Sequence, residues 1–258
     1  MSMALEDLIY TKAEGIARIV INRPWVYNAF RTKTIKEMCL ALEDAELDPE
    51  VRVVVLRGAG DKAFCTGGDA QESTEGGYDR EMDYWHMRNH HLLRALTKPV
   101  IAAVNGWAVG GGHILHIICD LSIAADTAKF GQAGPRVGSF DAGFGAAYLA
   151  RVVGEKKARE MWFLCRTYTA REALEMGLVN KVVPLAELDA EVNKWCREII
   201  ELSPTAIKFL KAAFNADTDH VFGSEAMSGA AVRLYWESDE AKQYKAAFAG
   251  KKGEKKDA

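Results

Sequence analysis

The sequence predicts an α/β fold for residues 1–200, followed by a helical region over residues 201–258 that ends in a disordered tail. Two observations predict this fold. Short β-branched runs, such as residues 51–56 and 100–104, alternate with segments whose apolar residues recur at helical spacing. After Pro184 only the helical spacing remains.

Local signals predict the first elements. Residues 15–22 form the first predicted strand, which ends at Arg23 and Pro24 because the residue before a proline is restricted and proline lacks an N–H donor. Residues 32–47 are predicted as a helix with Thr32 as its N-cap. One face of this helix carries Ile35, Met38 and Leu42.

The later elements follow in the same way. Residues 70–83 are polar and contribute little to a core, which predicts a mobile loop over a site. Residues 113–120 are predicted as a helix, and residues 121–125 and 177–183 as strands. The helices predicted after Pro184 are residues 188–202, a helix that starts at Pro204 with Ser203 as its N-cap, residues 223–236 and residues 238–248.

Composition narrows the function. The chain has 258 residues, a net charge of −3 and 49% hydrophobic residues, so no basic field attracts nucleic acid or an anionic membrane. It contains neither an apolar stretch of membrane-spanning length nor a secretory pattern. Its five cysteines lack the spacing of metal or redox motifs, which is typical of reduced thiols. We therefore expect a cytoplasmic protein without nucleic-acid or membrane partners.

Two glycine-rich turns indicate the chemistry. Gly110, Gly111 and Gly112 close an apolar run and open a helical pattern, and Gly67 and Gly68 follow another strand. Consecutive glycines let a backbone approach other groups closely and place free N–H groups at a helix N-terminus. Two such turns can bracket one carbonyl oxygen and stabilise a developing oxyanion.

Five ordered motifs resemble the crotonase (enoyl-CoA hydratase/isomerase) superfamily over nearly the whole chain. They are residues 21–24 with 28–30, residues 62–69, residues 106–112, residues 119–125 and residues 173–179. The resemblance implies a ββα-repeat core, a C-terminal helical trimerisation region, and a homotrimer or homohexamer. It also implies an acyl-CoA thioester whose carbonyl oxygen accepts the Gly68 and Gly111 N–H groups, with coenzyme A as part of the substrate and no separate cofactor.

The resemblance implies further substrate contacts. Lys251 matches a late lysine that serves the CoA phosphate across a subunit boundary, while Tyr27 replaces a basic residue often found near that phosphate. The residues expected to bind substrate or CoA are Thr66, Gly67, Asp69, Ala70, Tyr78, Trp107, Val109, Gly110, Ala133, Trp236 and Lys251.

The reaction depends on the remaining residues. Ile114 and Gly134 stand where the hydratases carry their two glutamates, and neither side chain can transfer a proton. Residues 130–143 and 156–162 instead resemble one subgroup, which comprises 1,4-dihydroxy-2-naphthoyl-CoA synthase and 2-ketocyclohexanecarboxyl-CoA hydrolase. One of these enzymes closes a ring and the other opens one, both through an enolate beside the thioester.

Asp141 is the residue expected to transfer a proton or orient a water, because burial among apolar residues can raise a carboxyl pKa. The alternative is that Asp141 caps a turn. Ser139 matches a residue that hydrogen-bonds the substrate, and turn capping is again the alternative. In the synthases of this subgroup a pocket holds a bicarbonate ion as base, and the hydrolases retain that pocket. Its matching residues here are Gln132, Gly134 and Trp162.

Two departures favour hydrolytic ring opening. Trp236 occupies the position of a synthase tyrosine, and an indole N–H cannot act as an acid or base. The loop that contains Glu72 and Glu75 is acidic, whereas the synthase loop is basic and suits a carboxylate-bearing substrate. Ring closure by a naphthoyl-CoA synthase and hydration of an alicyclic enoyl- or dienoyl-CoA remain the alternatives. No histidine spacing predicts a metal site.

Overall fold

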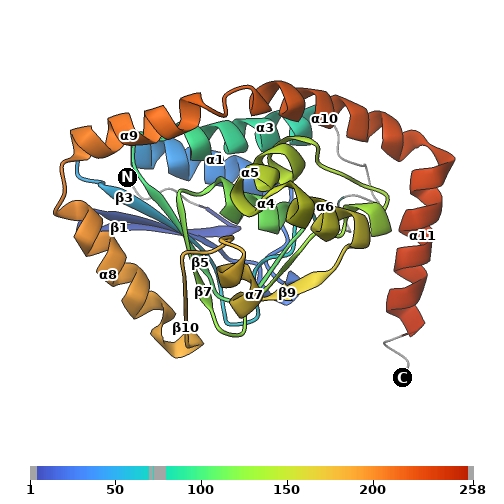
Figure 1. Cartoon of the computed structure of the whole chain (residues 1–258), viewed down its shortest axis with the longest axis horizontal. Helices are drawn as coiled ribbons and strands as arrows, with labels where there is room; N and C mark the ends of the chain where they lie inside the picture. The colour runs from blue at the N-terminus through green and yellow to red at the C-terminus, as the bar shows by residue number, and fades with distance from the viewer. Residues whose placement is uncertain (1–4, 70–71, 73–79, 255–258) are drawn as a thin grey trace.

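A computed structural model describes residues 5–69, 72 and 80–254, with side chains through residue 249. The larger of its two sheets has the strand order β1-β2-β3-β5-β7-β10 (Figure 1). The β1–β2 pair is antiparallel and every other pair in this sheet is parallel. The strands are β1 (Leu8–Ala13), β2 (Ile16–Ile21), β3 (Val53–Gly58), β5 (Val100–Val104), β7 (Leu121–Ala125) and β10 (Lys181–Val183).

Three strands of the smaller sheet each follow a strand of the larger sheet in the chain. The order of the smaller sheet is β4-β6-β8-β9, and in the chain β4 follows β3, β6 follows β5, and β8 follows β7. A helix comes after each of these strand pairs, so the predicted ββα repeat is confirmed. The strands are β4 (Ala63–Cys65), β6 (Trp107–Val109), β8 (Lys129–Gly131) and β9 (Thr167–Thr169).

The larger sheet buries both faces, because its strand residues alternate between two hydrophobic clusters. In β3, Val54 and Leu56 join the cluster that includes residues of α1 (Thr32–Leu47) and α3 (Arg80–Ala95). Their neighbours in the strand join the cluster formed with α8 (Leu188–Ile200) on the opposite face.

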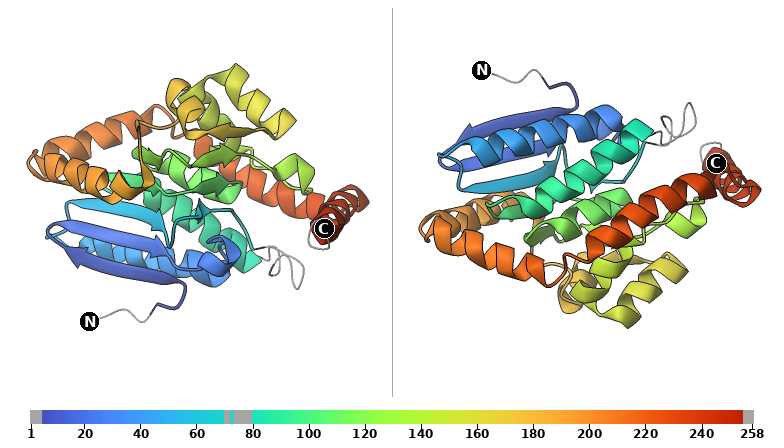
Figure 2. Two further views of the ribbon diagram at one scale, coloured as in Figure 1. Left: turned by 90° about the horizontal axis from the view of Figure 1, so that it is seen from below. Right: turned by 90° about the horizontal axis from the view of Figure 1, so that it is seen from above.

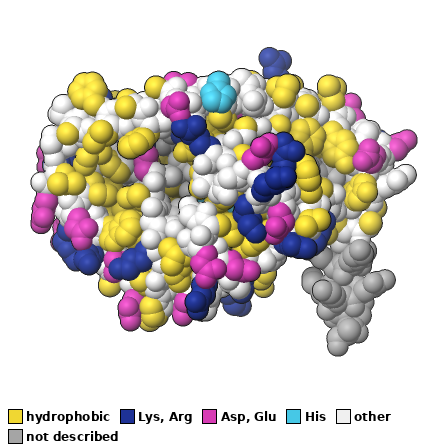
Figure 3. All heavy atoms as spheres, viewed as in Figure 1, with side chains coloured by type: hydrophobic (Ala, Val, Ile, Leu, Met, Phe, Trp, Pro, Cys, Tyr) yellow, Lys and Arg dark blue, Asp and Glu magenta, His cyan; other side chains and the backbone are white. Residues whose placement is uncertain are grey.

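The C-terminal helices lie along one edge of the molecule. In Figure 1, α9 (Pro204–Ala216) and α10 (Val221–Glu237) run above α1 and α3 along one edge of the molecule, and α11 (Asp239–Glu254) projects from the body, as it does in Figure 2. Figure 3 shows hydrophobic side chains along the edge that α9 and α10 form, and Phe209, Phe214 and Leu234 are exposed there. None of the helices formed by residues 5–69, 72 and 80–254 is long and apolar enough to cross a membrane.

The other helices are α4 (Gly111–Ile118), α5 (Leu149–Val153), α6 (Glu155–Leu164) and α7 (Ala170–Glu175), with the shorter segments η1 (Pro24–Val26), η2 (Gly134–Arg136), η3 (Gly143–Tyr148, a turn of π-helix) and η4 (Leu185–Glu187). Of these helices, α4 and α7 contact strands of the smaller sheet.

Several details differ from the sequence-based expectations. Residues 80–83, expected in the loop over residues 70–83, open α3, and residues 70–71 and 73–79 of that loop lie outside the described residues. The strand expected over residues 177–183 begins only at Lys181. The N-cap of α1 is Arg31 rather than Thr32, because the Thr34 hydroxyl accepts the Arg31 N–H. Strand β1 was not predicted, and only Leu8 in it is buried, as its edge position allows. Residues 251–254 belong to α11 instead of a disordered tail, in keeping with the helix propensity of lysine and glutamate.

Candidate active site

The two glycine turns meet in the structure. Gly110, the N-cap of α4, has a φ of 57° and a ψ of −127°, a conformation that favours glycine. A Cβ atom on Gly67 would lie 3.0 Å from the backbone nitrogen of Gly111, and one on Gly112 would overlap the Cys65 carbonyl oxygen. The turns therefore touch through their backbones, without side chains between them.

Local pairing directs the N–H groups of these turns. Phe30 N–H donates to Gly67 O, and Asp69 N–H donates to Phe30 O, both at 2.8 Å. Because a parallel bridge uses alternate backbone groups of one strand, the N–H of Gly68 points away from Phe30. Gly111 is the first residue of α4, so its N–H has no acceptor within that helix.

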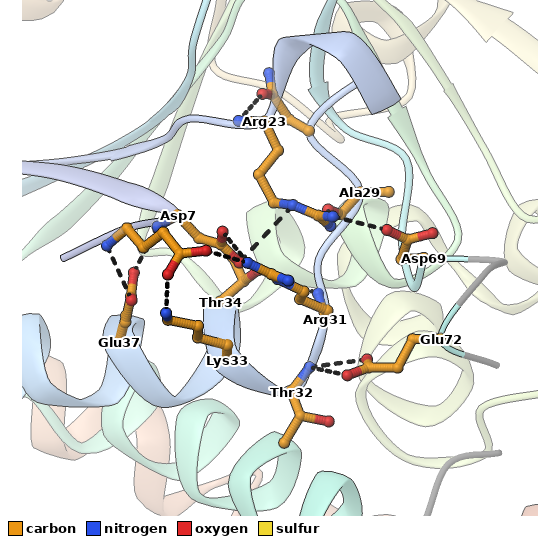
Figure 4. Close-up of polar contacts among 12 residues, drawn as sticks. Asp7, Arg23, Ala29, Arg31, Thr32, Lys33, Thr34, Glu37, Asp69 and Glu72 are labelled. Carbon is orange, nitrogen blue, oxygen red and sulfur yellow. Dashed lines mark hydrogen bonds and ion pairs between the residues drawn. The ribbon is translucent and has the colours of Figure 1, made fainter. Parts of the chain in front are cut away.

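A buried ion pair supports the Gly68 turn. Arg23 donates from Nη1 to Ala29 O at 2.6 Å and from Nη2 to Asp69 Oδ2 at 2.8 Å (Figure 4). The side chains of Arg23 and Asp69 are 8% and 14% exposed, so the pair is largely shielded from solvent. Asp69, expected to bind substrate, thus joins the turn to the segment that carries Phe30.

The carboxylate of Glu72 is hydrogen-bonded to the backbone. It accepts the N–H of Thr32 at the N-terminus of α1, with oxygen–nitrogen distances of 2.9 and 3.2 Å (Figure 4). Negative charge is favourable at this end of a helix. We expected Glu72 to repel a substrate carboxylate, but the structure directs it to α1. Glu75, the other acidic residue of this argument, lies outside the described residues.

Asp141 lies on the turn that precedes η3. Its Oδ1 accepts the N–H of Gly145 at 2.8 Å, which is the capping role we held as an alternative. The turn continues into η3, which packs against α4, the helix that Gly111 begins. The carbonyl oxygen of Gly145 in turn accepts a hydrogen bond from Trp162 Nε1 at 2.5 Å.

Burial and charge raise the pKa of Asp141. Loss of water contributes most, the negative charge of Glu225 adds to it, and His90 opposes both. Glu225 has the opposite shift. Its pKa is lowered because His90 Nδ1 lies 2.7 Å from its Oε1 and because the Phe144 N–H donates to its Oε2 at 3.1 Å. Asp141 is therefore the group that titrates nearer neutral pH.

A row of rings connects the Gly111 turn with this carboxylate pair. The Phe30 ring lies against Gly111, where a Cβ atom would approach its Cζ to 2.6 Å. The ring centroid of His86 is 5.4 Å from that of Phe30 and 4.3 Å from that of His90. Burial lowers the pKa of His86 to about 3, whereas Glu225 raises that of His90. Sequence analysis did not identify Glu225, whose only signal is a carboxyl on the apolar face of a helix.

The packing around Gly134 leaves little space for a side chain. A Cβ atom there would lie 2.6 Å from Ser139 O and 2.8 Å from Cζ3 of Trp162. Ser139 in turn donates its N–H to Gly134 O at 2.9 Å, so Ser139 is part of this turn. Neither Gly134 nor the buried Ile114 supplies a carboxyl group at the positions where the hydratases carry their glutamate pair.

The three residues expected to line a bicarbonate pocket have different neighbours. Gly134 contacts Trp162, but the indole N–H of Trp162 is bonded to Gly145 O. Gln132 is buried and its Nε2 lies 3.1 Å from Nδ1 of His113. The amide nitrogen of Gln132 thus faces His113 on α4.

The remaining expected residues lie on several separate elements. Thr66 Oγ1 donates to Tyr27 O at 3.3 Å, and Trp107 is 40% exposed on β6. Val109, which ends β6, and Ala133, the N-cap of η2, are both partly buried. Trp236 lies on α10 with Lys245 Nζ 4.4 Å from its ring centroid. Ala70 and Tyr78 lie outside the described residues, as does the side chain of Lys251, whose backbone belongs to α11.

Titratable groups elsewhere do not gather as a metal site would require. Within residues 5–69, 72 and 80–254, no group of three or more His, Cys, Asp or Glu side chains could hold a metal ion. All five cysteines are free and buried.

Comparison with known proteins decides the family. A sequence model described as enoyl-CoA hydratase/isomerase matches residues 11–253. The chain belongs to the enoyl-CoA hydratase/isomerase family. This confirms the resemblance to the crotonase superfamily and makes the protein an enzyme of CoA thioesters.

Solved structures of this family have the same fold. An enoyl-CoA hydratase from Mycobacterium avium subsp. paratuberculosis K-10 is 30% identical, with a TM-score of 0.87 over 96% of this chain and 97% of the other. An enoyl-CoA hydratase/isomerase from Xanthobacter autotrophicus Py2 is 32% identical, with a TM-score of 0.83 over 95% and 92%. One from Pseudoalteromonas atlantica T6c is 26% identical, with a TM-score of 0.87 over 95% and 98%.

Proposed function

We propose that this family member hydrolytically opens the ring of a cyclic β-ketoacyl-CoA, for which 2-ketocyclohexanecarboxyl-CoA is the test substrate. One observation carries the proposal. Asp141, a carboxyl group with a raised pKa, lies on a turn packed against the helix that Gly111 begins. Ile114 and Gly134, at the hydratase glutamate positions, cannot supply an acid or a base.

The residues would act in two steps. In the first, the Asp141 carboxylate takes a proton from water as its oxygen bonds to the ring ketone carbon, which leaves an alkoxide on that carbon. In the second, the alkoxide collapses to a carboxylic acid and the bond between this carbon and the α-carbon breaks. The electron pair of that bond becomes a thioester enolate, and Asp141 returns its proton to the α-carbon.

Gly68 and Gly111 would stabilise the enolate oxygen through their N–H groups. Such donors are worth about 3 kcal/mol each in a site without water. Phe30 excludes solvent on one side of Gly111, which strengthens these interactions. For the CoA moiety we propose contacts from Thr66, Ala70, Tyr78 and Lys251, as the family resemblance implies.

Ring closure by a naphthoyl-CoA synthase is the second candidate, and one observation favours it. Glu72 binds the N-terminus of α1, so its charge does not oppose a substrate carboxylate as the sequence argument assumed. Trp236 still stands at the position of the synthase tyrosine and cannot relay a proton. A bicarbonate ion near Gly134 and Trp162 belongs to this candidate alone in our proposal.

Turnover of two CoA esters tests the choice. Purified protein is incubated with 2-ketocyclohexanecarboxyl-CoA and, separately, with o-succinylbenzoyl-CoA, with and without added bicarbonate. We expect ring-opened product from the first ester and little conversion of the second. Bicarbonate-stimulated formation of naphthoyl-CoA would overturn the proposal in favour of ring closure.

We also propose a cytoplasmic homotrimer or homohexamer. The exposed Phe209 and Phe214 of α9 and Leu234 of α10 support it, because apolar side chains gathered on one edge are typical of a subunit interface. Light scattering coupled to gel filtration should give three or six times the mass of the chain, and a monomer would contradict this assembly.

A further inference from the structure

Glu225 bridges three segments beside Asp141. From α10, its Oε1 lies 2.7 Å from Nδ1 of His90 on α3, and its Oε2 accepts the N–H of Phe144 in η3 at 3.1 Å. It is 4% exposed, and His90 is fully buried. A carboxylate in such surroundings is costly unless it is paired and hydrogen-bonded, as this one is on both oxygens.

The same turn holds Asp141. Gly143, the first residue of η3, lies so close to α10 that a Cβ atom on it would approach the Glu225 Cα to 2.6 Å. One residue earlier, Ala142 N–H donates to Ser228 Oγ of α10 at 2.8 Å. The Asp141 carboxylate itself accepts the N–H of Gly145, farther along the same turn. The Glu225 carboxylate thus helps to hold the turn on which Asp141 lies.

We propose that Glu225 is a positioning residue for Asp141: its buried carboxylate, fixed by His90 and by the Phe144 N–H, holds the turn and places a permanent negative charge beside Asp141. The inference rests on the proposed role of Asp141 and adds a residue that controls the position and the ionisation of its carboxyl group. A like charge nearby disfavours ionisation of Asp141, so the proton is retained to higher pH than on an ordinary aspartate. The direction of the pKa shift at Asp141 agrees with this arrangement.

Other charged groups near the turn act less directly. Arg94 lies over the rings of Phe144 and Tyr148, with its Cζ 5.9 and 4.7 Å from their centroids, and Arg233 pairs with Asp83 at 2.7 Å. The charged side chains of α5 and α6 lie at the surface. Titratable or charged groups on the helices packed around the turn include Glu225, Arg233, Tyr235 and Glu237 on α10, His86, His90, His91 and Arg94 on α3, and His113 and His116 on α4.

Glu225→Gln removes the charge and can keep both hydrogen bonds. The amide oxygen accepts from Phe144, and the amide N–H donates to His90 Nδ1 if the imidazole proton moves to Nε2. Ser228→Ala is the matched control, because it removes a neutral hydrogen bond from the same helix to the same turn. Glu225→Asp keeps the charge and serves as the conservative variant.

The titration of Asp141 is measured without substrate. Protein labelled with [4-13C]aspartate gives carboxyl signals by NMR, and the Asp141 signal is assigned by its loss in Asp141→Asn. Glu225→Gln should lower the titration midpoint of Asp141 by about one pH unit. Ser228→Ala should leave the midpoint unchanged, and Glu225→Asp should keep it above that of the Gln variant. An unchanged midpoint in Glu225→Gln, or an equal shift in Ser228→Ala, would overturn the inference.

A second measurement covers the case in which Glu225→Gln does not fold. In the parent protein labelled with [5-13C]glutamate, the Glu225 signal, assigned with Glu225→Asp, should stay that of a carboxylate while Asp141 titrates. A Glu225 that gains its proton before or together with Asp141 would contradict the inference. Because neither titration uses substrate, failure to open 2-ketocyclohexanecarboxyl-CoA would refute the proposed function and leave this result separate.

Discussion

The backbone of Gly112 lies directly against the carbonyl group of Cys65, and a Cβ atom between them would overlap the carbonyl oxygen. This contact joins the start of α4 to the end of β4 and so fixes one glycine turn relative to the other. Gly112→Ala should therefore destabilise the protein by about 1–3 kcal/mol through overpacking. Urea unfolding measures the loss, and the open position of Gly223 in α10 provides the control variant Gly223→Ala. Equal stability of the two variants would contradict this account of the contact.

Gly111→Pro tests the oxyanion site. The substitution removes the N–H donor at the first position of α4, where proline is otherwise tolerated in helices. Crowding against the Phe30 ring adds distortion. We expect turnover to fall by about a hundredfold or more while the helical circular dichroism is retained. Near-parental turnover by the folded variant would show that catalysis does not need the Gly111 N–H.

Asp141→Asn tests proton transfer. Asparagine keeps an oxygen that accepts the Gly145 N–H, so the turn should persist, but the amide cannot take a proton at neutral pH. We expect kcat for ring opening of 2-ketocyclohexanecarboxyl-CoA to fall by about 10²–10⁴-fold with CoA-ester binding preserved. Binding is followed by isothermal titration. Activity above about a tenth of the parental value would assign the acid–base work to another residue.

The pH dependence of activity follows from the raised pKa of Asp141. The base must be ionised, so kcat/KM should be high above that pKa and fall as the pH is lowered through it. The acid limb should consequently lie above the value of 3.8 for an ordinary aspartate. A pH–rate profile with 2-ketocyclohexanecarboxyl-CoA shows the limb, and a profile flat down to pH 4 would exclude Asp141 as the base.

Stability should depend on pH through Glu225. Its pKa is lowered in the folded protein, so its contribution is present above the ordinary value of 4.5 and is lost as the pH falls toward the folded value. The unfolding free energy should decrease over that acid range in the parent and decrease less in Glu225→Gln. Urea midpoints at several pH values from 3 to 6 compare the two. Parallel curves would show that Glu225 has no special pairing.

The sequence by itself determined the elements whose signals are local. The bounds of α1, β5 and β7 match the predictions because helical periodicity and β-branched runs depend on short stretches of chain. The start of α9 at Pro204, capped by Ser203, follows from proline and serine chemistry alone. Strand β1 escaped prediction because an edge strand with one buried residue has almost no periodic signal.

For the site, the motif residues at Gly68, Gly111 and Asp141 were identifiable in the sequence, but their surroundings were not. Glu72 and Glu225 show the limit. In the sequence Glu72 belongs to an acidic loop and Glu225 to an ordinary helix. Only tertiary contacts place the first on the Thr32 N–H and the second between His90 and Phe144. Charge acts through distance and burial, and neither quantity exists until segments far apart in the chain have packed together.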